Sequence, residues 1–343
     1  MFLPRWTAYL ALAGIATLLA SGIPLRSTPV ADLANNAGPF HPRMIVLGID
    51  GMDPDILREV VAAYPDRMPN FARLIAEADG VLELGTSNPP QSPVAWSNFI
   101  TGRNPGGHGI YDFIHRDVTS YTPLPGTVTA GHAGAISLPG RWKFPTQEGG
   151  DSNRSGKAFW TMLGEAGVPA DVWRMPINFP VEPALGLSFP GMMTPALDSA
   201  YGKYTIFTTD PPVKTSMSGG EYRAVREFSG VIDTFLKGPP NQFKEGDPAS
   251  QVAITIYVDH ESQSVAIDTG LDVIVMEPGE WSDFAHVNFD MLPMGLDVLV
   301  GTGIRGVVRF YLRSIDPVLE LYASPINIDP EAPAMPVSEP DSA

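Results

Sequence analysis

Met44 to Ile49 form a continuous apolar run near the start of the globular part of the chain. A run without polar alternation is typical of a strand that is buried on both faces, as in a parallel sheet. Residues 55–63 and 70–78 then carry apolar side chains at helical spacing, and each starts with an Asp or Asn that can cap a helix. Residues 81–84 form a second, shorter apolar run. Strand, helix and strand in this order predict an α/β domain with a mostly parallel sheet flanked by helices.

The pattern of the chain changes after its first two thirds. Residues 157–166 have helical spacing and lead into a predicted strand at 170–176, so we expect the α/β part to cover residues 43–215. From residue 216 short alternating stretches are separated by Gly, Pro and Asp, which predicts a β-rich insertion over 216–320. Residues 321–343 are Pro-rich and acidic. We expect them to be a connector in which the chain is truncated.

Residues 1–24 have the composition of a targeting segment. Arg5 supplies a basic start, and residues 6–23 are almost uninterruptedly apolar. The segment predicts either a cleaved signal peptide or an uncleaved membrane anchor, because its length is near the lower limit for spanning a bilayer. Residues 25–42, rich in Pro, Asn and Ala, predict a linker. We therefore expect an exported protein, in the periplasm or anchored on the extracytoplasmic side of a membrane.

Charge and cysteine content limit the possible ligands. The formal net charge is −16, which argues against nucleic acid as a partner because nucleic-acid binding needs a basic surface. A small phosphate ester remains possible, since bound divalent cations can reverse the local field. The chain has no cysteine, so disulfides and thiolate metal sites are excluded. Any metal must accept carboxylate, hydroxyl and imidazole ligands.

Asp50 follows the first apolar run directly, within the sequence GIDG. The carboxyl ends of parallel strands are where open α/β sheets bind their ligands, which makes Asp50 a candidate metal ligand. The alternative is that Asp50 caps the next helix. Asp53 fits that structural role better, because Pro54 after it suits the first helical turn.

Ser92 lies among prolines just before residues 94–100, which can form a helix. A hydroxyl at a helix N-terminus faces the positive end of the helix dipole, where anions bind, although such a serine can also be a simple N-cap. No Gly-x-Ser-x-Gly motif surrounds it, so a metal-activated alkoxide is favoured over a hydrolase triad. If Asp50 and Ser92 share a metal, their oxygens should lie roughly 3–5 Å apart.

Three segments in order, GIDG, MPNFARLIAEADG and PPQSPVAWSNFITGRNPGGHGIYDF, resemble the type I phosphodiesterase and nucleotide pyrophosphatase family of the alkaline phosphatase superfamily. The resemblance implies an alkaline-phosphatase-like fold, incomplete in this chain, and two divalent metals, usually zinc. It implies that Asp50 binds one metal. Ser92, nine residues before Thr101, matches the family's nucleophilic Thr, which also contacts metal. The implied reaction is in-line attack on phosphorus, with a covalent phospho-enzyme that water then hydrolyses.

The chain departs from the family pattern at several positions. Phe113 stands where nucleotide pyrophosphatases have an Asn, so the resemblance does not carry nucleotide specificity. The family's Asp-x-x-x-His pair does not occur among the six histidines. Asp259 and His260 imitate a later Asp-His pair, but they lie between alternating stretches and predict a hairpin turn. His108, in the HGI turn, has a predicted structural role.

Two hypotheses of different classes remain. The chain is half of a metallohydrolase, with Asp50 and Ser92 as its identified site residues, which needs a C-terminal partner fragment and has little activity alone. Alternatively, it is a catalytically inactive exported binding protein on the same scaffold. A sulfatase or phosphoethanolamine transferase of the same superfamily is a third option. Sulfatases need a Cys/Ser-x-Pro-x-Arg motif, and Ser92 and Pro93 do not continue into one.

Overall fold

The computed structural model describes residues 44–78, 80–130, 135–138, 141–145, 150–198, 202–292 and 303–341. The predicted targeting segment and linker lie outside these residues. The helices are α3 (Pro54–Ala63), α4 (Pro69–Glu77), α5 (Ser92–Thr101), α6 (Pro105–His108) and α7 (Phe159–Glu165). Within the described residues, no helix is both long enough and apolar enough to cross a membrane.

The strands are short in the first half of the chain and longer in the second. The first eight are β1 (Ile114–Arg116), β2 (Pro123–Pro125), β3 (Val128–Ala130), β4 (Ala135–Leu138), β5 (Trp142–Pro145), β6 (Gly150–Ser152), β7 (Val172–Met175) and β8 (Ser188–Pro190). The next six are β9 (Tyr204–Thr208), β10 (Ser216–Met217), β11 (Gly220–Ala224), β12 (Val231–Pro240), β13 (Ala249–Asp259) and β14 (Ser264–Asp268). The last six are β15 (Val273–Met276), β16 (Ala285–Phe289), β17 (Ile304–Val308), β18 (Phe310–Ser314), β19 (Glu320–Ala323) and β20 (Asn327–Ile328).

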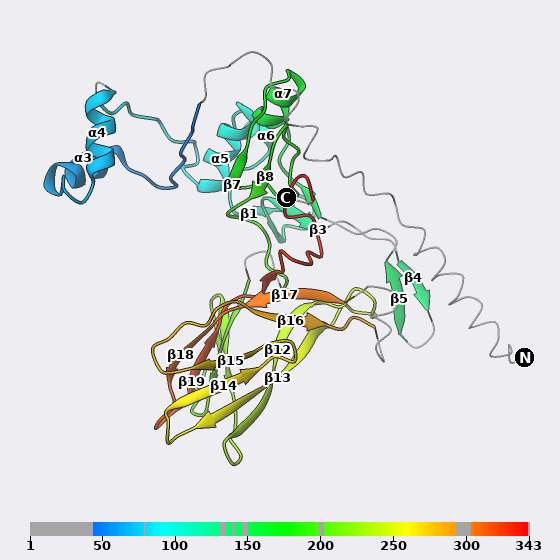
Figure 1. The fold of residues 1–343 in the computed structure, drawn as a ribbon. Helices are drawn as coiled ribbons and strands as arrows, with labels where there is room; N and C mark the ends of the chain where they lie inside the picture. Colours follow the sequence, from blue (N-terminus) through cyan, green and yellow to red (C-terminus); the bar gives the residue numbers. More distant parts are fainter. Residues whose placement is uncertain are drawn as a thin grey trace, which may run out of the picture.

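Helices α3 and α4 form where the periodicity predicts them. Asp53 is the N-cap of α3, as predicted: its Oδ1 accepts hydrogen bonds from the backbone N–H groups of Asp55 (2.8 Å) and Ile56 (3.0 Å), and Pro54 opens the helix. Neither helix has a buried residue, and the pair lies apart from the other labelled elements (Figure 1). Local sequence therefore forms these helices, but no described core covers their apolar faces.

The predicted strands at 44–49 and 81–84 are not formed. Both segments are extended without a strand partner, and their apolar side chains face solvent, with Ile45 92% and Leu82 95% exposed. A strand exists only through hydrogen bonds to a neighbour, and no described segment pairs with either run. The prediction of a mostly parallel sheet is therefore wrong for the described residues. The described part of the protein is mixed α/β with largely antiparallel sheets, and within it only the pairs β7–β8 and β9–β11 are parallel.

A small core holds α5 in place. Ile100 of α5, Ala158 and Trp160 at the start of α7, and Val172 of β7 are buried against one another. The strand predicted at 170–176 is confirmed as β7, which pairs with β8. This packing fixes one side of α5, and Ser92 at its N-terminus is half-buried.

The second half of the chain builds a β-rich region around a larger core (Figure 1). A four-stranded antiparallel sheet has the order β12-β13-β14-β15, a five-stranded sheet the order β10-β11-β9-β19-β18, and a three-stranded antiparallel sheet the order β16-β17-β20. The alternating stretch 252–258 lies in β13, whose side chains alternate between core and solvent. Fully buried side chains from all three sheets share one core, including Ile256, Phe289, Phe310 and Leu321.

Candidate functional site

Asp50 and Ser92 meet at the N-terminus of α5. The Ser92 hydroxyl donates a hydrogen bond to Asp50 Oδ2, and the two oxygens are 3.1 Å apart. This separation lies inside the 3–5 Å expected from the sequence. Asp50 lies in a turn after segment 44–49. Gly51 continues that turn with φ +67°, a left-handed backbone conformation that is unfavourable for residues with a side chain.

Trp96 is a third member of the site. Its indole Nε1–H donates to Asp50 Oδ1 at 3.0 Å, so the two oxygens of Asp50 have different donors. Ser92 and Trp96 are one helical turn apart and therefore share a face of α5. The same ring packs on Gly48, where an added Cβ would lie 2.5 Å from Trp96 Cη2. The glycine lets the chain approach the helix closely enough for Asp50 to reach both donors.

Ser92 is not the N-cap of α5. Gln91 holds that position, and Ser92 is the first helical residue, with its hydroxyl directed at Asp50 and not at a backbone amide. The alternative hypothesis, that Ser92 is a simple N-cap, is therefore wrong. The helix behind it is anchored by buried side chains, among them Val94 and Ile100, so its positive end is held in a fixed place beside the hydroxyl. An anion such as a phosphoryl group is favoured at this position.

The residues at this site supply only part of a metal centre. One carboxylate and one hydroxyl suit a hard divalent cation. Within the described part of the chain, however, no group of three His, Asp or Glu with ligand atoms close together includes Asp50; such a group occurs at His286, Asp329 and Glu331 in the β-rich region. Asp50 and Ser92 therefore do not fit a complete two-metal site by themselves.

His108 has the structural role predicted from the sequence. Its side chain is fully buried, its Nδ1 accepts a hydrogen bond from the backbone N–H of Ile110 (3.1 Å), and its Nε2 lies 2.7 Å from the side-chain amide of Asn98. Burial, followed by the nearby Arg154 charge, lowers the pKa of His108, so the ring is neutral at physiological pH. These contacts tie the HGI turn to α5 and leave no ring nitrogen for a metal.

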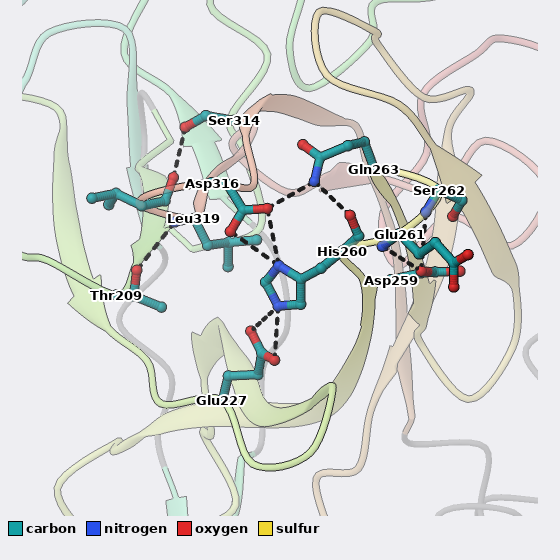
Figure 2. A network of polar contacts seen from close by, with 11 residues as sticks. Thr209, Glu227, Asp259, His260, Glu261, Ser262, Gln263, Ser314, Asp316 and Leu319 are labelled. Atoms are coloured by element: carbon teal, nitrogen blue, oxygen red, sulfur yellow. Dashed lines mark hydrogen bonds and ion pairs between the residues drawn. The ribbon is translucent and has the colours of Figure 1, made fainter.

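Asp259 and His260 form the predicted hairpin turn between β13 and β14. Asp259 Oδ1 accepts hydrogen bonds from the backbone N–H groups of Glu261 (2.9 Å) and Ser262 (3.1 Å). Figure 2 shows the His260 ring between two carboxylates, with Nδ1 3.0 Å from Asp316 Oδ1 and Nε2 3.0 Å from Glu227 Oε1. Because both ring nitrogens face carboxylates, the pKa of His260 is raised, first by Glu227 and then by Asp316. The histidine is thus an ion-pair partner that connects three loops.

The sequence identified Asp50 and Ser92 but not Trp96. A signal for it was present, since Trp96 follows Ser92 by four residues in a segment predicted to be helical.

Phe113 is half-buried, and its carbonyl oxygen accepts a hydrogen bond from the Gly126 N–H at 2.7 Å. It lies one residue before β1.

Comparison with known proteins adds one finding. No curated protein and no solved structure matches the chain. The sequence pattern of the type I phosphodiesterase / nucleotide pyrophosphatase family matches residues 44–262, which is more than half of the chain and includes Asp50, Ser92 and Trp96. The protein therefore belongs to the type I phosphodiesterase / nucleotide pyrophosphatase family.

Proposed function

We propose that this chain provides the nucleophile half of a metal-dependent phosphoric ester hydrolase that acts on small phosphate esters through a phosphoserine intermediate. Family membership supports a hydrolase of the phosphodiesterase type. The observation that carries the proposal is the hydrogen bond from the Ser92 hydroxyl to Asp50 at the positive end of α5. Ser92 is the proposed nucleophile, and Asp50 and Ser92 are the proposed ligands of a divalent cation, Zn²⁺ in the first instance.

The chemistry assigned to the residues balances as two displacements. Ser92 Oγ forms a bond to phosphorus while the bond from phosphorus to the leaving alcohol oxygen breaks, and the serine proton leaves with that alcohol. The oxygen of a water molecule then bonds to phosphorus while the bond from phosphorus to Ser92 Oγ breaks; the phosphate product leaves, and a proton from the water restores the serine hydroxyl. Asp50 aligns the hydroxyl through its hydrogen bond, and the α5 dipole favours the anionic phosphoryl group at that place. A bound divalent cation supplies what these groups lack, a lower serine pKa and neutralisation of phosphoryl charge.

Under this proposal another polypeptide segment supplies further metal ligands, because no described group of three His, Asp or Glu side chains includes Asp50. The exposed apolar runs at 44–49 and 81–84 support such a partner, because extended backbone that is not paired with a neighbouring strand can accept added strands. The partner is proposed to be a C-terminal fragment of the same type of enzyme. The apolar segment at residues 6–23 supports export, so we place the assembly outside the cytoplasm, with or without membrane anchoring.

The test combines turnover with detection of the intermediate. The chain is incubated with bis-p-nitrophenyl phosphate and either Zn²⁺ or Mn²⁺, and p-nitrophenolate release is followed by absorbance. The peptide that contains residue 92 is then analysed by mass spectrometry for a phosphoryl adduct. We expect slow release by the chain alone and an adduct at Ser92. The adduct should disappear in Ser92→Ala and persist in Ser92→Thr, which retains a hydroxyl as in most family members.

Each result decides a different part of the proposal. An adduct that survives in Ser92→Ala would show that another residue is the nucleophile. Robust turnover by the unmodified chain would show that the site is already complete and that its ligands have been misassigned. Absence of both release and adduct under every condition would favour the alternative, an inactive binding protein that keeps the hydrolase scaffold.

A further inference from the structure

His286, Asp329 and Glu331 converge on one side of the sheet β16-β17-β20. His286 lies on β16, while Asp329 and Glu331 follow β20 at the opposite edge. One ligand atom from each of the three side chains lies within 4.8 Å of the other two. The pairing explains the convergence, because His286 is opposite Val307 of β17 and Val307 is opposite Asn327 of β20. The sheet thus brings together residues that are distant in sequence.

His286 is held in a fixed orientation by Asp272. Asp272 Oδ2 lies 2.8 Å from His286 Nδ1 and also accepts the backbone N–H of His286 at 2.7 Å. Because a carboxylate can only accept, Nδ1 carries the proton of the neutral ring and Nε2 keeps its lone pair. Nε2 is 3.9 Å from Glu331 Oε2. A carboxylate behind one nitrogen of a histidine is the usual support for metal binding through the other nitrogen.

The environment of Asp329 is a second, independent observation at this group of side chains. Its side chain is fully buried, and Oδ1 accepts a hydrogen bond from the backbone N–H of Glu331 at 2.8 Å. Oδ2 lies 2.8 Å from Arg305 Nη2, but the two groups are not aligned for a hydrogen bond, and Oδ2 has no other hydrogen-bond partner among the described residues. A buried carboxylate oxygen in this condition is costly unless a further group satisfies it.

Charge and ligand type indicate the kind of cation. Asp272, Asp329 and Glu331 are three carboxylates around His286, and among the described residues Arg305 is the one arginine or lysine that forms an ion pair with any of them. The excess negative charge favours a divalent ion. One imidazole nitrogen with carboxylate oxygens suits Zn²⁺ or a similar transition metal, whereas Ca²⁺ and Mg²⁺ prefer oxygen ligands throughout.

We propose that His286, Asp329 and Glu331 bind a Zn²⁺-type divalent cation, with Asp272 as the positioning residue behind His286. Ligand atoms about 2.1 Å from one ion lie roughly 3.0–3.4 Å apart when adjacent, so the group must contract by up to about 1.8 Å. The Glu331 side chain is 73% exposed and is free to rotate inward. The ion connects β16 to the segment after β20, so its binding stabilises the β-rich region. This site is separate from the Asp50–Ser92 site and does not depend on the proposed catalysis.

The experiment is a titration of the full chain, first stripped of metal by a chelator, with Zn²⁺ alone, followed by calorimetry and thermal unfolding. We expect saturable binding and a rise in Tm. Glu331→Gln should abolish both or weaken affinity at least about tenfold, and Asp272→Asn should weaken it about 10- to 100-fold. Asp50→Asn should leave this binding in place. His260→Ala is the matched control, because it removes another carboxylate-flanked histidine outside the group.

The choice of variants keeps the result decisive. Glu331 is exposed, so Glu331→Gln should leave the fold intact, and circular dichroism without metal checks this. His286→Ala should also lose Zn²⁺ binding. Because His286 is part of β16, a loss in this variant counts as support only if Glu331→Gln loses binding as well. The proposal is overturned if the unmodified chain shows no Zn²⁺ binding, or if affinity and Tm shift are the same in Glu331→Gln as in the unmodified chain. Loss of the binding in Asp50→Asn instead would assign the ion to the α5 site.

Discussion

Gly238 of β12 lies against Phe289 of β16, where the four-stranded sheet packs on the three-stranded sheet that carries His286. A Cβ at residue 238 would lie 2.3 Å from both Cδ1 and Cε1 of the Phe289 ring. Carbon atoms in contact are normally about 3.5–4.0 Å apart, so the overlap exceeds about 1 Å. Phe289 is fully buried and cannot move aside without displacing its neighbours.

Gly238→Ala should therefore lower the free energy of unfolding by about 1–3 kcal/mol. The smaller backbone entropy of unfolded alanine offsets this by about 0.4–1 kcal/mol, so the steric cost remains the larger effect. Phe289→Ala alone should cost about 3–5 kcal/mol through the cavity that it leaves. In the double variant the new methyl group occupies part of that cavity. The double variant should thus cost about 1–2 kcal/mol less than the two single variants added together.

The free energy of unfolding is measured by urea unfolding, followed by tryptophan fluorescence, for the unmodified chain, the two single variants and the double variant. Gly85→Ala is the matched control, because a Cβ there meets nothing within 4 Å and its backbone has no left-handed conformation. The control should change stability by less than about 0.5 kcal/mol. If the two substitutions were additive within about 0.5 kcal/mol, Gly238 and Phe289 would not be in contact, and the packing of β12 on β16 described above would be refuted.

The remaining predictions concern His260 and Asp53. The raised pKa of His260 means that its ion pairs with Glu227 and Asp316 stabilise the fold fully below about pH 6.5, the ordinary value, and that this contribution is lost as the pH rises through the raised pKa. His260→Ala should therefore lower Tm near pH 6 and have little effect near pH 9, whereas an equal loss at both values would contradict the ion pairs. Asp53→Ala should destabilise α3 by about 1 kcal/mol, so hydrogen exchange in the peptide 54–63 should become about fivefold faster. Exchange in β12 and β13 should not change, and an unchanged rate in 54–63 would show that the cap contributes nothing.

Local sequence was sufficient for the helices and turns. The helix α3, its Asp53 cap and the Asp259 hairpin turn all form where the residues predict them. Each depends on contacts between residues a few positions apart, which propensity and capping rules describe directly.

The proximity of Asp50 and Ser92 was predicted, but for a partly wrong reason. The expectation placed Asp50 at the carboxyl end of a parallel strand, whereas the observed contact depends on Gly48 packing under Trp96. The spacing of Trp96 from Ser92 marked it as a neighbour on α5. Its hydrogen bond to Asp50 could not be read from that spacing, because it also depends on where the turn at Asp50 lies.

By itself the sequence determined the family, the helices α3, α4, α5 and α7, the capped turns and the two residues proposed for catalysis. Only the tertiary structure decided that Met44–Ile49 is not a strand, and that His286 meets Asp329 and Glu331. The physical reason is the same in both cases. A helix closes its hydrogen bonds within four residues, whereas a strand, or a cluster of ligands, is made by segments far apart in the chain and exists only if folding brings those segments together.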